Sequence, residues 1–257
     1  MTRPLGSILK PWGSRLAGTV LLGLTACGGS VPAPYELKVC EEPPPPAGVT
    51  AFTQCGPSLD FTPINRYQGA LPSIQEREDA VVFINGSCTG TLIAASAGPV
   101  VLTAGHCVGL GDRSFLVFNF EDEADGDPLM TEGTVIEQST APDYALILLD
   151  TLPTAAPAPL TTLATERLAV IQHPRGSPKV IAEGRYADAC NRLVYYTDLD
   201  TLVGSSGAAV LNEQGYVLGI HTDGDCEVSG RGANRGWTAS AIVEASEYLQ
   251  ADDLAER

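Results

Sequence analysis

The sequence is poor in positive charge and in aromatic side chains. Fifteen Lys and Arg residues stand against 31 Asp and Glu residues, which gives a formal net charge of -16. A surface of that sign repels phosphate backbones and anionic lipid headgroups, so we expect no nucleic-acid partner. Charged residues make up only 18% of the chain and aromatic residues 6%, whereas glycine (27) and proline (19) are plentiful. This composition favours short strands joined by turns over a helical bundle.

The chain lacks an obvious membrane span, because the apolar run AGTVLLGLTA is too short for one. It follows Arg3, Lys10 and Arg15, a pattern typical of an export signal. The run ends in LTAC, which resembles a bacterial lipobox. We therefore expect residues 1–26 to be a lipoprotein-type signal peptide and Cys27 to be the lipidated first residue, the alternative being an ordinary cleaved signal. Either signal predicts export, and the lipobox predicts a bacterial cell envelope, in the periplasm or on the outer surface, with the protein anchored or released.

No CxxC pair with metal-binding spacing is present either. The chain has seven cysteines, of which six remain if Cys27 is lipidated. An oxidising compartment favours disulfides over free thiols or zinc sites. Six cysteines allow fifteen pairings, and their positions along the chain favour three bridges. The expected bridges are Cys88–Cys107, Cys190–Cys226 and Cys40–Cys55.

Residues 27–75 show little hydrophobic periodicity and contain the proline run Pro43–Pro46. Such a segment is typical of a semi-rigid spacer. We therefore expect a lipid-anchored tether that carries the small Cys40–Cys55 disulfide, followed by one domain over residues 76–257.

Short β-rich runs alternate with turn residues from about residue 79 onward. About eleven such runs, among them PVVLTA, YALILLD and YVLGIHT, fit a barrel or a sandwich. The hydrophobic content of 44% is enough to bury a core. At the end of the chain, Ile242, Ala245 and Leu249 recur at helical spacing after Ser240, a candidate N-cap. We expect an all-β domain with a C-terminal helix and no second domain.

Three polar motifs could together support attack of a hydroxyl on a carbonyl. Such attack needs a base for the hydroxyl proton, a group that orients the base, and donors that stabilise the oxyanion. His106 follows an apolar strand in VLTAGHC, Asp143 opens the run DYALILLD, and Ser206 lies in the glycine-bounded turn GSSG. The order, with histidine first, and the lack of a GxSxG motif argue against an α/β-hydrolase.

TAGHC, DYALI and GSSG, in this order, resemble the three signature blocks of chymotrypsin-like (trypsin-like) serine peptidases. The resemblance spans residues 79–250 and implies a double β-barrel and endopeptidase activity on polypeptides. It makes His106 the general base, Asp143 its orienting carboxylate and Ser206 the nucleophile. The backbone N–H groups of Gly204 and Ser206 would form the oxyanion hole.

A catalytically silent binding module of the same fold is the alternative to an enzyme. The intact triad argues against it, because a silent relative would usually have lost a catalytic side chain. Esterase activity on small substrates would use the same oxyanion machinery. Ser205 stands where trypsin has an aspartate that pairs with a newly freed N-terminus, so trypsin-style activation is not expected.

Two residues at set distances from Ser206 predict which bond is cleaved. Thr201 lies five residues before Ser206, and His221 lies fifteen residues after it. This spacing resembles bacterial glutamyl endopeptidases, in which a threonine or serine and a histidine hold the substrate carboxylate, so it predicts cleavage after glutamate. The alternative is Asp200, six residues before Ser206, where trypsin-like enzymes place the carboxylate that selects Lys or Arg.

Two further features are expected to be structural. His173, in IQHPRGSPK, receives no catalytic role. The acidic run EDEADGD, residues 121–127, is expected to be a solvated loop, with a calcium site as the alternative. No metal or other cofactor is expected, and we expect a monomer whose partner is a polypeptide substrate.

Overall fold

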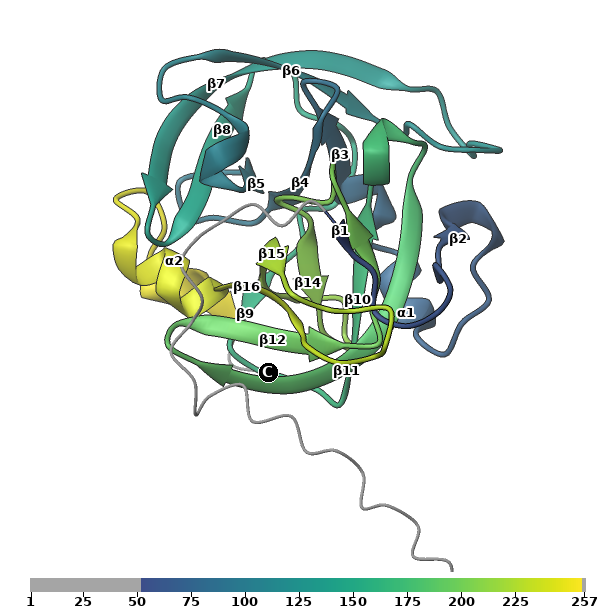
Figure 1. The fold of residues 1–257 in the computed structure, drawn as a ribbon. Helices are drawn as coiled ribbons and strands as arrows, with labels where there is room; N and C mark the ends of the chain where they lie inside the picture. The colour runs from purple at the N-terminus through teal and green to yellow at the C-terminus, as the bar shows by residue number, and fades with distance from the viewer. Residues whose placement is uncertain (1–51, 256–257) are drawn as a thin grey trace, which may run out of the picture. The chain divides into compact units, whose positions relative to one another are not determined.

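The computed structural model describes residues 52–255, which belong to the unit spanning residues 37–257. Two closed barrels of six strands make up most of these residues (Figure 1). The first barrel closes in the order β3-β4-β5-β8-β7-β6, all antiparallel. Its strands are β3 (Val81–Ile84), β4 (Cys88–Ile93), β5 (Val100–Thr103), β6 (Arg113–Phe118), β7 (Leu129–Thr140) and β8 (Asp143–Leu149).

The second barrel closes through antiparallel pairing in the order β10-β11-β12-β16-β15-β14 and back to β10. Its strands are β10 (Arg167–Gln172), β11 (Val180–Cys190), β12 (Leu193–Thr197), β14 (Ala209–Leu211), β15 (Val217–Gly224) and β16 (Asn234–Thr238). The predicted all-β double barrel is therefore confirmed.

The remaining elements are short. The strands are β1 (Phe52–Thr53), β2 (Thr62–Pro63), β9 (Leu160–Thr161), β13 (Thr201–Leu202) and β17 (Leu254–Ala255). The α-helices are α1 (Pro72–Gln75) and α2 (Ala239–Ala245), and the 3-10 helices are η1 (Ile64–Arg66), η2 (Glu78–Ala80), η3 (Gly105–Cys107), η4 (Pro174–Gly176) and η5 (Ala251–Asp253). None of the helices within residues 52–255 is long and apolar enough to cross a membrane.

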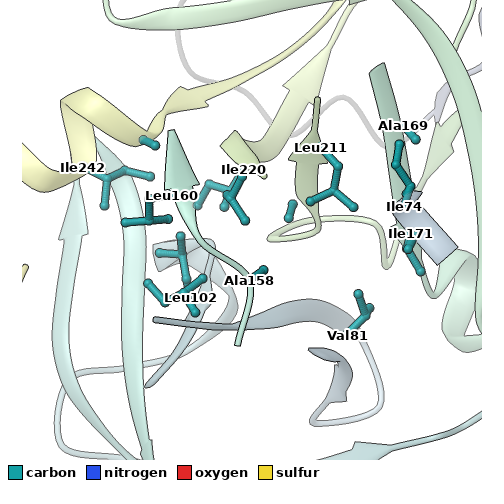
Figure 2. Close-up of a cluster of buried hydrophobic side chains, with 14 of the residues drawn as sticks. Ile74, Val81, Leu102, Ala158, Leu160, Ala169, Ile171, Leu211, Ile220 and Ile242 are labelled. Atoms are coloured by element: carbon teal, nitrogen blue, oxygen red, sulfur yellow. The ribbon is translucent and has the colours of Figure 1, made fainter. Parts of the chain in front are cut away.

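Strands β5, β8 and β10 are buried on both faces, which explains their nearly unbroken apolar runs. Successive side chains of a strand point to opposite faces. On β10, Leu168 and Val170 pack among the side chains of the second barrel. Ala169 and Ile171, on the other face, join a cluster to which both barrels contribute (Figure 2). β5 and β8 alternate in the same way between the first barrel's own core and this shared cluster.

Residues 52–75 belong to the folded domain and are not a free spacer. β1 pairs with β13, and β2 pairs with β11. Ile64 and Ile74 are fully buried in the shared cluster. The predicted boundary at residue 76 is therefore wrong, because an irregular, proline-rich segment can bury isolated apolar side chains without showing periodicity. The expected signal peptide, the lipidated Cys27 and the start of the tether lie outside the described residues and stay predictions.

The bridge beside the histidine motif is confirmed. Cys88 opens β4, Cys107 ends η3, and the two form a disulfide with their Cα atoms 6.2 Å apart. This bond ties the loop that carries His106 to the neighbouring strand.

The other two expected bridges are wrong. Cys226 forms its disulfide with Cys55, and not with Cys190 as expected, so the Cys40–Cys55 bridge is excluded too. Cys190 is also disulfide-bonded, and Cys40 lies outside the described residues. The reason is the pairing of β1 with β13, which brings the N-terminal segment to a part of the chain that no sequence motif connects it with.

The C-terminal helix begins two residues earlier than its sequence suggests. Thr238, and not the expected Ser240, is the N-cap, because the Thr238 side chain accepts a hydrogen bond from the Ala241 N–H at 3.2 Å. α2 ends at Ala245, so Leu249 lies beyond it but is still buried.

The disulfides should differ in their contribution to stability. Cys55 and Cys226 are 171 residues apart, whereas Cys88 and Cys107 are 19 apart. Loop-closure entropy gives about 5 kcal/mol for the longer loop and about 3 kcal/mol for the shorter one. We therefore expect Cys55→Ala with Cys226→Ala to lower the urea midpoint more than Cys88→Ala with Cys107→Ala, as measured by equilibrium unfolding. The reverse order would contradict the loop-length argument.

Candidate active site

His106 and Asp143 are brought together by the pairing of β5 with β8. η3 follows β5 and carries His106, and Asp143 is the first residue of β8. One carboxylate oxygen of Asp143 lies 2.6 Å from Nδ1 of His106, and the other accepts a hydrogen bond from the His106 backbone N–H at 2.9 Å. A Cβ at Gly105 would overlap the Ser139 carbonyl oxygen, so the close packing of η3 against the end of β7 requires glycine at position 105.

The electrostatics of this pair suit a general base. The hydrogen bond to Asp143 raises the pKa of His106 above its ordinary value, and burial opposes the rise. Since Nδ1 faces the carboxylate, it carries the ring proton, and Nε2 has the free electron pair. The His106 side chain is 30% exposed, so a substrate can reach it.

Ser206 lies at the first barrel because its turn packs against β4 and η3. The Thr89 N–H donates to the Ser206 carbonyl oxygen at 3.0 Å, and Sγ of Cys107 lies 3.8 Å from the same oxygen. A Cβ at Gly207 would overlap the Thr89 carbonyl and the Thr103 hydroxyl, so the close packing requires glycine there. The Ser206 hydroxyl makes no hydrogen bond to any residue within 52–255; in serine hydrolases the bond to the base often tightens only with substrate bound.

The residues before Ser206 form a tight turn. The Ser205 N–H donates to the Leu202 carbonyl at 2.9 Å, and Gly204, at the third position, has a φ of 100°. A positive φ at that position is typical of a type II turn and favours glycine. The buried Ser205 hydroxyl accepts a hydrogen bond from the Leu202 N–H at 3.0 Å and stabilises the turn from within.

The orientation of the Gly204 N–H is set by a bond on the other side of its peptide group. In a trans peptide the C=O and the N–H point in opposite directions. The Val203 carbonyl accepts a hydrogen bond from the Arg175 N–H at 2.5 Å, so the Gly204 N–H of the same peptide is directed away from η4.

The same rule applies to the Ser206 N–H. The Ser205 carbonyl accepts a hydrogen bond from the Ala208 N–H at 3.0 Å, which directs the Ser206 N–H the other way. Within the part of the chain that the structure describes, neither the Gly204 N–H nor the Ser206 N–H is used by another group. Both are therefore available as oxyanion donors.

Thr89 is a residue of this site that sequence reasoning missed. Its hydroxyl accepts a hydrogen bond from the His173 N–H at 3.0 Å and donates one to the Gly204 carbonyl at 2.8 Å. Its carbonyl accepts from the Thr103 hydroxyl at 2.8 Å. With the bond to the Ser206 carbonyl, these contacts tie the first barrel to the turn of the second. Nothing in SCTGTLI signals this role, because the partner Gly204 is 115 residues away.

The carboxylate of Asp200 is occupied by backbone groups. One oxygen accepts from the Cys55 N–H and the other from the Asp60 N–H, both at 2.7 Å. Asp200 is only 1% exposed, and this burial raises the pKa of its carboxyl group. Thr201, the neighbouring candidate, is fully buried in β13.

His221 is a buried, neutral histidine backed by a tyrosine that the sequence analysis did not single out. Its Nδ1 lies 2.5 Å from the hydroxyl of the fully buried Tyr196. The same hydroxyl also lies 3.5 Å from the Arg235 carbonyl oxygen, a long contact to an acceptor. A hydroxyl that donates to Nδ1 leaves the ring proton of His221 on Nε2. Burial lowers the pKa of His221 to about 3.

His173 lies in an aromatic environment. Its ring centroid is 5.1 Å from that of Phe83 and 5.8 Å from that of Phe120. Its Nδ1 lies 3.1 Å from the Ser177 carbonyl oxygen, and burial lowers its pKa to about 3. These contacts are those of a packing residue and give it no catalytic role.

The acidic run differs from the expected solvated loop at its first residue. The Glu121 side chain is fully buried and forms an ion pair with the buried Lys179, which also pairs with Glu78. Burial raises the pKa of Glu78 to about 8. Glu78, Glu121 and Asp125 are spaced closely enough to hold a cation, but the Lys179 ammonium already lies against the two glutamates. The carboxylates at 122–127 are exposed, as expected.

The sequence comparison finds one family. Residues 88–220 match the model of the trypsin-like peptidase domain, a stretch that contains all three triad candidates. No curated protein sequence matches the chain.

Solved structures resemble the fold. Two inactive forms of Rv3671c from M. tuberculosis H37Rv, one of them a serine-to-alanine mutant, are 19% identical to this chain. Their TM-scores are 0.55 and 0.53, with 68% of this chain and 88% and 90% of those chains covered. A serine endoprotease from Yersinia pestis has a TM-score of 0.56 at 16% identity, covering 70% of this chain and 66% of that one. At these identities the likeness shows the fold.

The chain's three histidines should titrate differently. His106 has a raised pKa, whereas burial lowers the pKa values of His173 and His221 to about 3. An NMR titration between about pH 5 and pH 9 should therefore show one titrating imidazole, with a pKa above the ordinary value of about 6.5. In Asp143→Asn this pKa should fall, because the opposite charge is lost. A second histidine titrating in that range would contradict the burial of the other two.

Proposed function

Because the chain belongs to the family of trypsin-like peptidase domains, we propose that it hydrolyses peptide bonds as a serine endopeptidase with Ser206, His106 and Asp143 as its catalytic residues. The observation that carries these roles is the two-point attachment of His106 to Asp143, which fixes both the imidazole and its loop. The turn that packs against this loop offers a serine and two unused backbone donors, and polypeptides are the substrates of the family.

The geometry supports acyl transfer in two steps. The Ser206 hydroxyl oxygen attacks the scissile carbonyl carbon, and its proton passes to Nε2 of His106. The new oxyanion accepts hydrogen bonds from the N–H groups of Gly204 and Ser206. The C–N bond then breaks, the imidazolium protonates the leaving amine, and an acyl-enzyme remains. Water, deprotonated by the same imidazole, hydrolyses that ester and releases Ser206, while Asp143 stabilises the imidazolium in both steps.

Removal of the nucleophile should abolish activity and leave the fold unchanged. For Ser206→Ala we expect kcat for peptide hydrolysis to fall by a factor on the order of 10⁶ and fluorophosphonate labelling to disappear. Thermal unfolding should stay close to that of the wild type, because the Ser206 hydroxyl makes no hydrogen bond to another group in the described range 52–255. Ser240→Ala, at an exposed position, is the matched control. Labelling of Ser206→Ala at the wild-type rate would place the nucleophile elsewhere.

We further propose that the enzyme prefers glutamate before the scissile bond, through a pocket that includes Thr201 and His221. When the Tyr196 hydroxyl donates to Nδ1 of His221, the ring proton is on Nε2, and such a donor suits a carboxylate acceptor. The rival residue, Asp200, has both carboxylate oxygens bound by backbone N–H groups, which leaves little capacity to hold a lysine or arginine. The net charge of -16 slows the approach of acidic substrates, so the preference has to come from contacts in the pocket.

Specificity constants on peptides that differ only in the residue before the scissile bond test this preference. The wild type should cleave after Glu faster than after Gln, Lys, Arg or Phe. A hydrogen bond to a charged group contributes about 1.5–3 kcal/mol, so His221→Ala should lower kcat/KM for the Glu peptide roughly 10- to 100-fold and leave the Phe peptide nearly unchanged. Tyr196→Phe should reduce the same Glu preference, since it frees the other tautomer.

Tyr195→Phe is the matched control for Tyr196→Phe. The hydroxyl of the neighbouring Tyr195 is buried and has no hydrogen-bond partner among residues 52–255, so its removal should leave the preference intact. A wild-type preference for Lys or Arg would contradict the proposed pocket and assign selectivity to Asp200.

A further inference from the structure

The N-terminal segment, residues 52–60, runs along the strand that leads into the catalytic turn. β1 pairs antiparallel with β13, with Phe52 opposite Leu202 and Thr53 opposite Thr201. Leu202 is also the first residue of the tight turn that immediately precedes Ser206. Within residues 52–255, β13 has β1 as its sole strand partner. The backbone before the nucleophile is therefore supported by the N-terminal segment.

Asp200 holds this segment from the side of β13. Its two carboxylate oxygens accept hydrogen bonds from the N–H groups of Cys55 and Asp60, at 2.7 Å each. Its own carbonyl accepts from the Gln172 side chain at 2.9 Å, which fixes the Asp200 backbone to β10. A buried carboxylate with two charge-assisted bonds is a strong and directional acceptor, so it defines where residues 55 and 60 lie.

A second attachment joins the segment to the residues that follow β15. Cys55 forms its disulfide with Cys226, and the Gly56 N–H donates to the Glu227 carbonyl at 3.1 Å. These partners follow directly on β15, the strand that carries His221. Residues 52–60 are thus bound both to β13, the strand before the catalytic turn, and to the residues after β15.

We propose that Asp200 is a positioning residue, which clamps residues 52–60 against β13 and so holds the catalytic turn in its working shape. Only Thr201 and Leu202 separate it from Val203, whose carbonyl bond to Arg175 directs the Gly204 N–H. A shift of the backbone at Asp200 would therefore move the Gly204 N–H, a proposed oxyanion donor only four residues away. This role explains why an aspartate occupies position 200 although it does not select the substrate. The proposal depends on the proposed serine chemistry only where labelling or cleavage rates are used to test it.

Asp200→Asn in the full-length protein separates this role from a general loss of stability. Asparagine keeps one acceptor oxygen but turns an NH₂ donor toward the second backbone N–H, which loses its partner. We expect faster hydrogen exchange in peptides covering residues 52–60 and unchanged exchange in β6 and β7. Fluorophosphonate labelling per folded molecule should slow on the order of 10- to 100-fold. The NMR pKa of His106 should not move, because its partner Asp143 lies in the other barrel.

The matched control is Asp198→Asn. Asp198 is two residues away, its side chain is 57% exposed, and it pairs with Arg185 at the surface, so labelling should stay within two-fold of wild type. Cys55→Ala with Cys226→Ala removes the second attachment and leaves Asp200 intact. This double variant should also label more slowly, and it carries the test if Asp200→Asn does not fold.

Three results would overturn the clamp. The first is hydrogen exchange of residues 52–60 at the wild-type rate in Asp200→Asn. The second is fluorophosphonate labelling of this variant within two-fold of wild type although its residues 52–60 exchange faster. The third is a selective loss of cleavage after Lys or Arg in this variant. The last result would make Asp200 a substrate-binding residue. If the wild-type protein neither labels nor cleaves peptides, the proposed function fails, and the exchange measurement alone decides the clamp.

Discussion

The hydrogen bonds of Thr89 hold together two halves of a site that come from different barrels. His106 and Asp143 belong to the first barrel, and the turn with Ser206 belongs to the second. The shared apolar cluster makes the barrels adhere, but apolar burial has no preferred direction and cannot by itself fix the turn against the histidine loop. Directional bonds from Thr89 to the carbonyls of Gly204 and Ser206 can do so. The geometry of the candidate site therefore depends on a few polar contacts embedded in an apolar interface.

A second polar link between the barrels follows the same logic. Lys179 lies immediately before β11, and its buried ammonium contacts Glu78 before β3 and Glu121 after β6. Its backbone N–H donates to the Phe120 carbonyl at 2.8 Å. Burying such charges costs desolvation energy. The ion pairs therefore contribute more to a defined arrangement of the two barrels than to the free energy of unfolding. Buried polar groups thus lie at the interface of the two barrels, where they fix how one barrel packs against the other.

The sequence predicted the parts of the molecule that depend on neighbours along the chain. Short β-rich runs between turn residues predicted the strands, and three short motifs predicted His106, Asp143 and Ser206, because each motif places its residue at the end of a strand or in a turn. The disulfide partner of Cys226 and the acceptor role of Asp200 depend on β1, a strand of only two residues with no periodicity to detect. The Asp200–Cys55 contact spans 145 residues. Such contacts follow from the closed topology and cannot be found by reading local patterns.

Glu121 illustrates a different limit. It begins a run of acidic residues, and composition alone indicates a solvated loop. The structure separates this residue from its neighbours because the chain enters the loop from β6, and the first position is still within reach of Lys179. A uniform sequence can therefore contain one structural residue among solvated ones.

The position of Cys55 and Cys226 near opposite ends of the domain bears on when the protein can act. During synthesis Cys55 leaves the ribosome long before Cys226. The segment that contains β1 therefore cannot form its disulfide until Cys226 has been made. A chain that ends before residue 226 contains the histidine, the aspartate and the serine but lacks the disulfide partner of Cys55. The proposed chemistry therefore needs the chain well past its nucleophile, as far as a residue that takes no part in bond cleavage.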